Sequence, residues 1–287
     1  MMVKPAVTEM WEAAAARLRD AGIESPALEA QFLVGIALGL SRTQVVLGTE
    51  VSPSSNQVCE LERLVEAREN RVPLAYLRGT QEFYGLTFAV TPAVLIPRPE
   101  TELLVDIAVE RLAGIEGGTL LDVGAGSGCI AITVARSLPR VRCVGVDVSD
   151  AALEVARANA ERLGVGGRAA FLRGDMLDSV GSRSAEGIVS NPPYIRSEEI
   201  PALQAEVRDH EPDVALDGGA DGLRFHRRLA AGATRVLKRG GFLAVEVAMG
   251  QAAEVAELMG AAGFVRVQSH RDLASIERVV SGRLPEG

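Results

Sequence analysis

The stretch LLDVGAGSGCIAITVA, residues 120–135, joins an apolar run typical of a buried strand to an apolar run of helical length. Gly124, Gly126 and Gly128 stand between the two runs. Glycines let the backbone turn tightly and bring N–H groups at a helix N-terminus close to a ligand. The spacing therefore predicts a strand, a ligand-binding loop and a helix, although a plain strand-to-helix turn would read the same way.

Strand-like and helix-like segments alternate downstream of this loop. One helix follows the cap Ser149, and another begins near Leu223 and is expected to run to Gly240. Such alternation predicts an α/β fold with a doubly wound, mostly parallel, seven-stranded sheet, covered by helices on both faces. The last two strands are too close in sequence for a crossover helix and are expected to pair antiparallel. The predicted strands are 119–123, 141–146, 169–173, 187–190, 242–247, 264–267 and 278–281.

Upstream of the loop the pattern changes to short helices. Helical spacing of apolar residues, and a capping box over Ser41–Gln44, predict a small N-terminal helical domain at residues 1–80. The alternation around a Tyr84-Gly85 turn predicts a strand pair that links the domains over residues 81–96. Residues 97–287 then form the α/β domain.

Composition excludes several classes of protein. The chain has 287 residues, of which 47% are hydrophobic and 24% charged, as in ordinary globular proteins. No apolar run is long enough to cross a membrane and no signal peptide is evident, so we expect a cytoplasmic protein. The net charge of −8 argues against a nucleic-acid partner. Three unpaired cysteines and three scattered histidines offer no material for a metal site.

Acidic residues follow the next two predicted strands. Asp147 ends the second strand and can accept both hydroxyls of a ribose. The third strand ends in RGDM, where Asp175 can accept from an exocyclic amine and Met176 can cover an adenine ring. The carboxyl ends of neighbouring parallel strands share one edge of a sheet. The sequence therefore predicts a nucleoside-binding cleft at this edge.

The glycine loop favours one cofactor over another. G-x-G-x-G lacks the third glycine of the dinucleotide fingerprint G-x-G-x-x-G, and no phosphate grip is evident. S-adenosyl-L-methionine carries a ribose, an adenine and a sulfonium cation but no phosphate, so it fits this pattern better than NAD. Asp122 beside the loop suits a cationic amino-acid moiety, or it is simply a hydrogen-bonding residue at a strand end.

The fourth predicted strand ends in the corner Asn191-Pro192-Pro193-Tyr194. Proline fixes φ, has no N–H and restricts the residue before it, so the corner presents rigid acceptors without competing donors. Acceptors on both hydrogens of a planar –NH2 group would orient it and support the charge that develops when its nitrogen attacks a methyl. Tyr194 can stack on the planar group. A rigid turn without chemistry is the other interpretation.

At this point the sequence resembles the class I S-adenosylmethionine-dependent methyltransferases, and within them the protein-(glutamine-N5) methyltransferases that modify peptide chain release factors. The corner alone is shared with adenine-N6 nucleic-acid methyltransferases, which remain the alternative. The matching stretches cover most of the chain: PLAYLRGTQEFYGLTF (73–88), VLIPRPETE (94–102), LLDVGAGSGCIAI, SNPPYI and EPDVALDGGADGL (211–223).

The resemblance implies methyl transfer from S-adenosylmethionine to the glutamine of the Gly-Gly-Gln tripeptide of release factors, with the helical domain recognising the substrate. Separately, we expect a monomer. It assigns Asp147 to the cofactor ribose, and Asp175 with Met176 to the adenine end. It places Arg98, Glu100 and Thr101 beside the cofactor, where they also read as a helix start. It assigns the methionine part of the cofactor to Gly124, Ala125, Gly126, Ser127 and Gly128. It assigns the substrate glutamine to Asn191, Pro192, Pro193 and Tyr194, and it also places Asn191 near the cofactor.

The chain departs from the family pattern at two kinds of position. Met176 stands where relatives often have an aromatic or other large residue. Ala248 and the pair Ala274-Ser275 stand where relatives tend to have glycine, and we expect both to lie away from the site.

Overall fold

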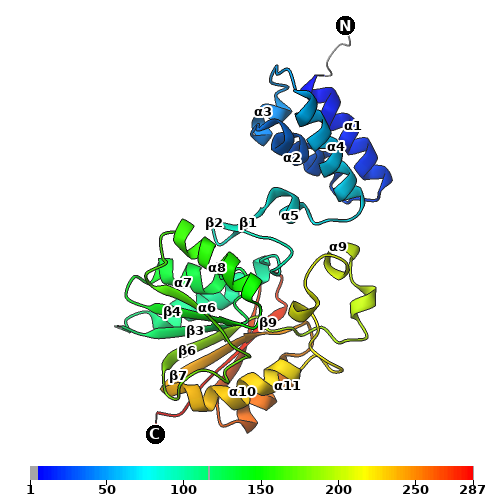
Figure 1. The fold of residues 1–287 in the computed structure, drawn as a ribbon. Helices are drawn as coiled ribbons and strands as arrows, with labels where there is room; N and C mark the ends of the chain where they lie inside the picture. Colours follow the sequence, from blue (N-terminus) through cyan, green and yellow to red (C-terminus); the bar gives the residue numbers. More distant parts are fainter. Residues whose placement is uncertain (1–5, 116, 287) are drawn as a thin grey trace. The chain divides into compact units, whose positions relative to one another are not determined.

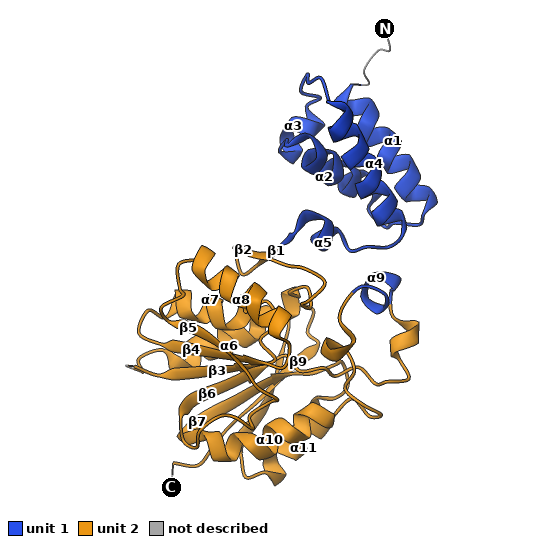
Figure 2. Ribbon diagram, in the orientation of Figure 1, with its two compact units in different colours: residues 1–80, 204–210 blue, residues 81–203, 211–287 orange. Residues whose placement is uncertain are grey.

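The computed structural model describes residues 6–115 and 117–286, which divide into two compact units (Figure 2). Unit 1 contains the chain up to Thr80 together with Gln204–His210. Unit 2 contains Gln81–Leu203 and the chain from Glu211 onward. Within the described residues, no helix is both long and apolar enough to cross a membrane.

Unit 2 is built on a seven-stranded sheet with strand order β5-β4-β3-β6-β7-β9-β8 (Figure 1). All neighbouring pairs are parallel except those of β9, which is antiparallel to both β7 and β8. The predicted α/β fold, including the antiparallel end, is therefore confirmed. The strands are β3 (Thr119–Val123), β4 (Arg142–Asp147), β5 (Ala169–Arg173), β6 (Ala185–Ser190), β7 (Leu237–Glu246), β8 (Val265–Arg271) and β9 (Glu277–Arg283).

Helices cover both faces of this sheet, each over its own apolar cluster. On one face lie α6 (Glu102–Leu112), α7 (Cys129–Ser137) and α8 (Asp150–Arg162), and on the other α10 (Arg224–Val236) and α11 (Ala252–Ala261) (Figure 1). Because the chain runs from β3 outward to β5 and then returns to β6 on the other side of β3, the connections reverse direction between β3 and β6. Open α/β sheets bind their ligands at such a switch point.

Two helix starts were predicted correctly from cap residues. Ser149 caps α8, since its Oγ accepts from the backbone N–H of Ala152 at 3.2 Å. The capping box at Ser41 is also present, at the start of α3 (Arg42–Val46).

The expected helix to Gly240 is too long. Helix α10 ends at Val236, and β7 begins at Leu237, which is buried and pairs with Ala185. The register then shifts, so that the next pair joins Gly187 to Phe242. Gly240 lies in this irregular stretch with φ +72°, where a side chain would be strained, so the glycine serves a bulge and not a helix end.

Unit 1 is helical up to residue 78. Its helices are α1 (Val7–Asp20), α2 (Pro26–Leu38), α3, α4 (Ser55–Glu69) and α5 (Leu74–Arg78), packed around one apolar cluster. A two-stranded sheet, β1 (Thr80–Phe83) and β2 (Leu86–Ala89), follows. Its turn residues Tyr84 and Gly85 have φ of 52° and 69°, the positive pair that a tight hairpin requires.

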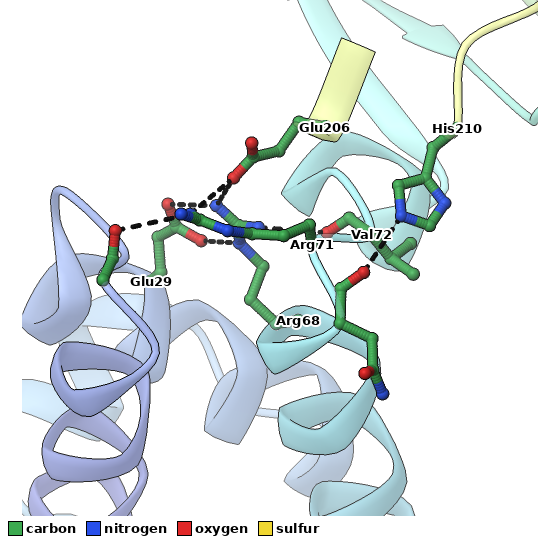
Figure 3. A network of polar contacts seen from close by, with 8 residues as sticks. Glu29, Arg68, Arg71, Val72, Glu206 and His210 are labelled. Carbon is green, nitrogen blue, oxygen red and sulfur yellow. Dashed lines mark hydrogen bonds and ion pairs between the residues drawn. The ribbon is translucent and has the colours of Figure 1, made fainter. Parts of the chain in front are cut away.

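A short segment from the second half of the chain completes unit 1. Helix α9 (Ala205–Arg208) follows the 3-10 turn Ile200–Ala202 and carries Glu206. Arg68 donates from Nε to Glu29 Oε2 at 2.5 Å and from Nη2 to Glu206 Oε1 at 2.9 Å (Figure 3). Arg71 also donates to Glu206 Oε1, at 3.1 Å. The Arg68 side chain is only 7% exposed, so this network fastens α9 through a nearly buried cation.

Replacing Arg68 with alanine is expected to lower the free energy of unfolding of unit 1 by about 3 kcal/mol, because two half-buried carboxylates lose their shared partner. Arg63 on the same helix is the matched control: it pairs with Glu60 at the surface, and Arg63→Ala should cost less than about 0.5 kcal/mol. Urea unfolding followed by circular dichroism measures both. Equal effects for the two variants would contradict a structural role for the buried network.

Candidate functional site

A cavity of about 630 Å³ opens where β3, β4, β5 and β6 end. Its volume is in the range of pockets that hold small ligands. Residues from the PRPETE loop line it as well, among them Arg98 and Thr101. Of the residues predicted from the sequence, the lining contains Gly124, Ala125, Gly126, Ser127, Asp147, Asp175, Met176, Asn191 and Pro193.

Four of the residues that the resemblance assigns to the site are outside this lining: Gly128, Pro192, Tyr194 and Glu100. Gly128 has φ +79° and caps α7, and a Cβ there would lie 2.9 Å from side-chain atoms of Ile132 and Phe171. This glycine therefore serves the turn and the close packing behind the loop. Pro192 is buried.

Asp147 is held in place by the loop itself. Its Oδ2 accepts from Gly126 N and its Oδ1 from Ser149 N, both at 2.9 Å. A carboxylate has about four lone-pair positions, so two remain for hydroxyls of a ligand. The turn that carries Gly126 thus also fixes the orientation of the acidic side chain on the next strand.

Asp122 lies behind the loop and is fully buried. Its Oδ2 accepts from Ala131 N at 3.0 Å, in the first turn of α7. Burial raises the pKa of this carboxyl to about 7, and the hydrogen bond from Ala131 acts in the opposite direction. Since Asp122 is absent from the cavity lining, the structure supports its interpretation as a hydrogen-bonding residue at a strand end.

The RGDM turn, which follows β5, also lines the cavity. Met176 is buried and has φ +55°, a conformation that L residues seldom adopt, so the turn is held by its surroundings. Asp175 is more exposed, and its Oδ1 accepts from Arg228 Nη1 at 2.9 Å. The carboxylate retains acceptor positions for an amine.

The four arginines of the lining all have partners. Arg98 pairs with Glu211 at 2.5 Å, and Arg173 pairs with Asp150 at 2.8 Å. Arg228 bridges Asp175 and Asp178, and Arg224 donates to the Asp217 carbonyl. Because most of this positive charge is neutralised by neighbouring carboxylates, the arginines of the cavity are poorly suited to bind a diphosphate. Its donors and acceptors fit S-adenosylmethionine, with Asp147 available to the ribose hydroxyls and Met176 to an adenine ring.

The Pro-Pro corner begins at the end of β6, next to the loop. Ser190 Oγ donates to the carbonyl of Val123 at 2.6 Å and so ties the ends of β6 and β3 together. Asn191 donates from Nδ2 to Thr101 Oγ1 at 3.1 Å. Within residues 6–115 and 117–286, no donor of the protein reaches Asn191 Oδ1, so this oxygen can accept from a ligand.

Gln251 and the segment EPDVALDGGADGL pack against the side of the corner that faces away from the cavity. Gln251 donates from Nε2 to the Tyr194 carbonyl at 3.0 Å, and its Oε1 accepts from Ala248 N at 3.0 Å. Ala248 is absent from the cavity lining, but the Gln251 side chain connects its backbone to the corner. At Gly222, with φ +74°, a methyl group would overlap the Tyr194 carbonyl oxygen.

Gly222→Ala is expected to displace Tyr194, to lower kcat for the expected methyl transfer at least 10-fold, and to cost about 3 kcal/mol of stability through strain and overlap. Gly219→Ala is the control in the same loop: it has φ +89°, but its Cβ would meet nothing nearer than Arg224 Cβ at 3.4 Å. It should cost about 1 kcal/mol and leave kcat unchanged. Thermal unfolding and steady-state kinetics distinguish the two, and identical kcat values would contradict the packing argument.

Two buried glutamates at the site were not found from the sequence. Glu211 accepts from Arg98 and, at 3.2 Å, from Ile96 N, so it joins the PRPETE loop to the EPDV segment. Glu246 ends β7 and is 2% exposed. The signal for Glu246 was a charge at the carboxyl end of an otherwise apolar parallel strand, the edge where ligands bind.

Glu246 accepts two hydrogen bonds from residues of the site. Thr101 Oγ1 donates to Oε2 at 2.7 Å, and the Tyr194 hydroxyl donates to Oε1 at 3.2 Å. Burial raises the pKa of Glu246 to about 7, while these two bonds lower it. The hydroxyl of Tyr194 is thus engaged on the side of β7 and not in the cavity lining.

Comparison with known proteins gives matches over nearly the whole chain. Residues 9–79 match the model of the PrmC N-terminal domain, and residues 99–208 match the methyltransferase small domain. The release factor glutamine methyltransferase of Caulobacter vibrioides is 41% identical, over 96% of this chain and 96% of the relative. That of Geobacter sulfurreducens is 42% identical, over 93% of each chain.

Among solved structures, a methyltransferase from Pyrococcus furiosus is similar with a TM-score of 0.55 and 17% identity, over 77% of this chain and 99% of that one. At this identity the likeness concerns the fold alone, and it agrees with the class I methyltransferase sheet described above.

Proposed function

The chain belongs to the release factor glutamine methyltransferase family, and on this premise we propose that its substrate is the glutamine of the Gly-Gly-Gln tripeptide of peptide chain release factors. The protein is an S-adenosylmethionine-dependent methyltransferase that methylates the side-chain amide nitrogen of this glutamine. The observation that carries the proposal is identity above 40% that extends over both the helical region and the α/β region.

The residues of the cavity suit this reaction. When bound, the cofactor supplies a methyl group on a sulfonium, which reacts with a nucleophile without prior activation. Asp147 would accept from the ribose hydroxyls, and the loop from Gly124 to Gly128 would border the methionine part. Met176 would cover the adenine.

The Pro-Pro corner would receive the substrate amide. Asn191 Oδ1 and the backbone carbonyls of the corner would accept from the two amide hydrogens, which orients the nitrogen and stabilises the positive charge that develops on it. No strong base is needed, since the methylated nitrogen becomes acidic and gives up its proton readily. The residues therefore act through fixed acceptors and not through proton abstraction.

The remaining assignments concern partners and place of action. We propose residues 1–80 as the part that recognises the release factor, 81–96 as a linker, and 97–287 as the methyltransferase domain. The net charge of −8 supports a protein substrate over a nucleic acid. We further propose a monomer that acts in the cytoplasm, where release factors work in translation termination.

The decisive comparison is between two classes of substrate. The purified protein with radiolabelled S-adenosylmethionine should methylate an intact release factor, and it should not methylate a release factor in which the Gly-Gly-Gln glutamine is alanine. Adenine-containing DNA and RNA serve as the alternative acceptors. Label on nucleic acid, with none on the release factor, would replace the proposed function by that of an adenine-N6 methyltransferase.

A further inference from the structure

A continuous chain of hydrogen bonds runs behind the Pro-Pro corner, inside unit 2. It begins at Asn191 Nδ2, which donates to Thr101 Oγ1 at 3.1 Å. Thr101 then donates to Glu246 Oε2 at 2.7 Å, and Tyr194 donates to the other oxygen of Glu246 at 3.2 Å. Thr101 and Glu246 are each 2% exposed, so water does not compete for these bonds.

The chain has only one consistent direction when Glu246 is ionised. A carboxylate can only accept, so both the Thr101 and the Tyr194 hydroxyl must point their hydrogens at it. The Thr101 hydroxyl has a single hydrogen and therefore can only accept from Asn191. Asn191 must then turn its –NH2 group toward Thr101, which leaves Oδ1 on the side of the cavity that Asn191 lines.

We propose that Glu246 is a positioning residue that fixes the hydrogen-bond polarity of the active site: through Thr101 it obliges Asn191 to present an acceptor, and it holds Tyr194 by its hydroxyl. The inference rests on the proposed function, because the group that needs this acceptor is the –NH2 of the substrate glutamine. If the Asn191 amide were turned the other way, its –NH2 group would face the –NH2 group of the substrate. Two donors cannot form a hydrogen bond, so the substrate would be repelled.

The polarity of the hydrogen-bond chain therefore depends on the ionisation of Glu246. Burial, and more weakly Glu100, raise its pKa to about 7, whereas Thr101, Tyr194 and Arg278 favour the carboxylate. His226 faces the same residue from α10 and donates from Nε2 to the Glu246 backbone carbonyl at 2.9 Å, and the Cys129 thiol interacts electrostatically with the Glu246 carboxyl. Protonated Glu246 is also a donor, so the polarity is lost as the pH falls below about 7.

Glu246→Gln tests the proposal because it keeps the shape and removes the obligatory acceptor. The amide can donate to Thr101, which frees the Thr101 hydrogen for Asn191 Oδ1 and turns Asn191 around. With an intact release factor as substrate, kcat should fall about 10- to 100-fold, while the Kd for S-adenosylmethionine and the melting temperature stay near wild type. The wild-type decline in kcat below about pH 7 should be absent in the variant.

Two substitutions at Thr101 provide a second test of the proposal. Thr101→Val removes both bonds of the hydroxyl and should lower kcat to a similar extent, whereas Thr101→Ser keeps the hydroxyl and should restore kcat to within about threefold of wild type. Full activity of Glu246→Gln, or equal kcat for the Val and Ser variants, would overturn the inference. A wild-type protein that leaves release factors unmethylated would instead overturn the proposed function itself.

Discussion

Asn191→Ala is expected to lower kcat for release factor methylation by about 10²- to 10³-fold, the cost of losing one preorganised hydrogen-bonding group at a reacting centre. Alanine removes the proposed Oδ1 acceptor, which the hydrogen bond from Nδ2 to Thr101 leaves on the cavity side. The two prolines that follow are unchanged, so the backbone of the corner should keep its course.

Single-turnover kinetics with saturating S-adenosylmethionine measure this loss, and calorimetric titration checks that the Kd for the cofactor changes less than about threefold. Asn56→Ala, at an exposed position of α4, is the control and should leave both quantities unchanged. Retained turnover in Asn191→Ala would remove the corner from the chemistry and leave it as a rigid turn.

Asp147→Ala should weaken binding of S-adenosylmethionine by about 100-fold or more. The substitution removes the acceptor that we propose for the ribose hydroxyls, and such charge-assisted bonds are among the stronger ones in proteins. It also leaves Gly126 N and Ser149 N without their partner, so the loop loses its anchor.

Glu154→Ala is the matched control, because Glu154 lies seven residues further along, at an exposed position of α8, and is absent from the cavity lining. Its cofactor affinity should stay within about twofold of wild type. Calorimetric titration of both variants gives the comparison. Equal Kd values for the two would contradict a role of Asp147 in cofactor binding.

Much of the fold could be predicted because its signals are local. Alternating apolar segments gave the parallel sheet, the short final connection gave the antiparallel end, and cap residues such as Ser149 gave helix starts. The glycine loop, Asp147 and Asn191 could be placed at one edge because carboxyl ends of parallel strands always meet there.

Features that depend on distant partners escaped prediction. The roles of Thr101, Gln251 and Glu246 arise only when the PRPETE loop, α11 and β7 are brought to the corner, and no spacing in the sequence records that encounter. The end of α10 was misjudged for a related reason: pairing of Leu237 with Ala185 overrides the helical pattern. Packing also decided that Gln204–His210 belong with unit 1.

The most direct test of the function is the location of the transferred methyl. An intact release factor is incubated with the purified protein and isotopically labelled S-adenosylmethionine, and its peptides are then sequenced by tandem mass spectrometry. We expect one added methyl, on the side-chain nitrogen of the glutamine in the Gly-Gly-Gln tripeptide. A methyl on any other residue, or none at all, would contradict the account.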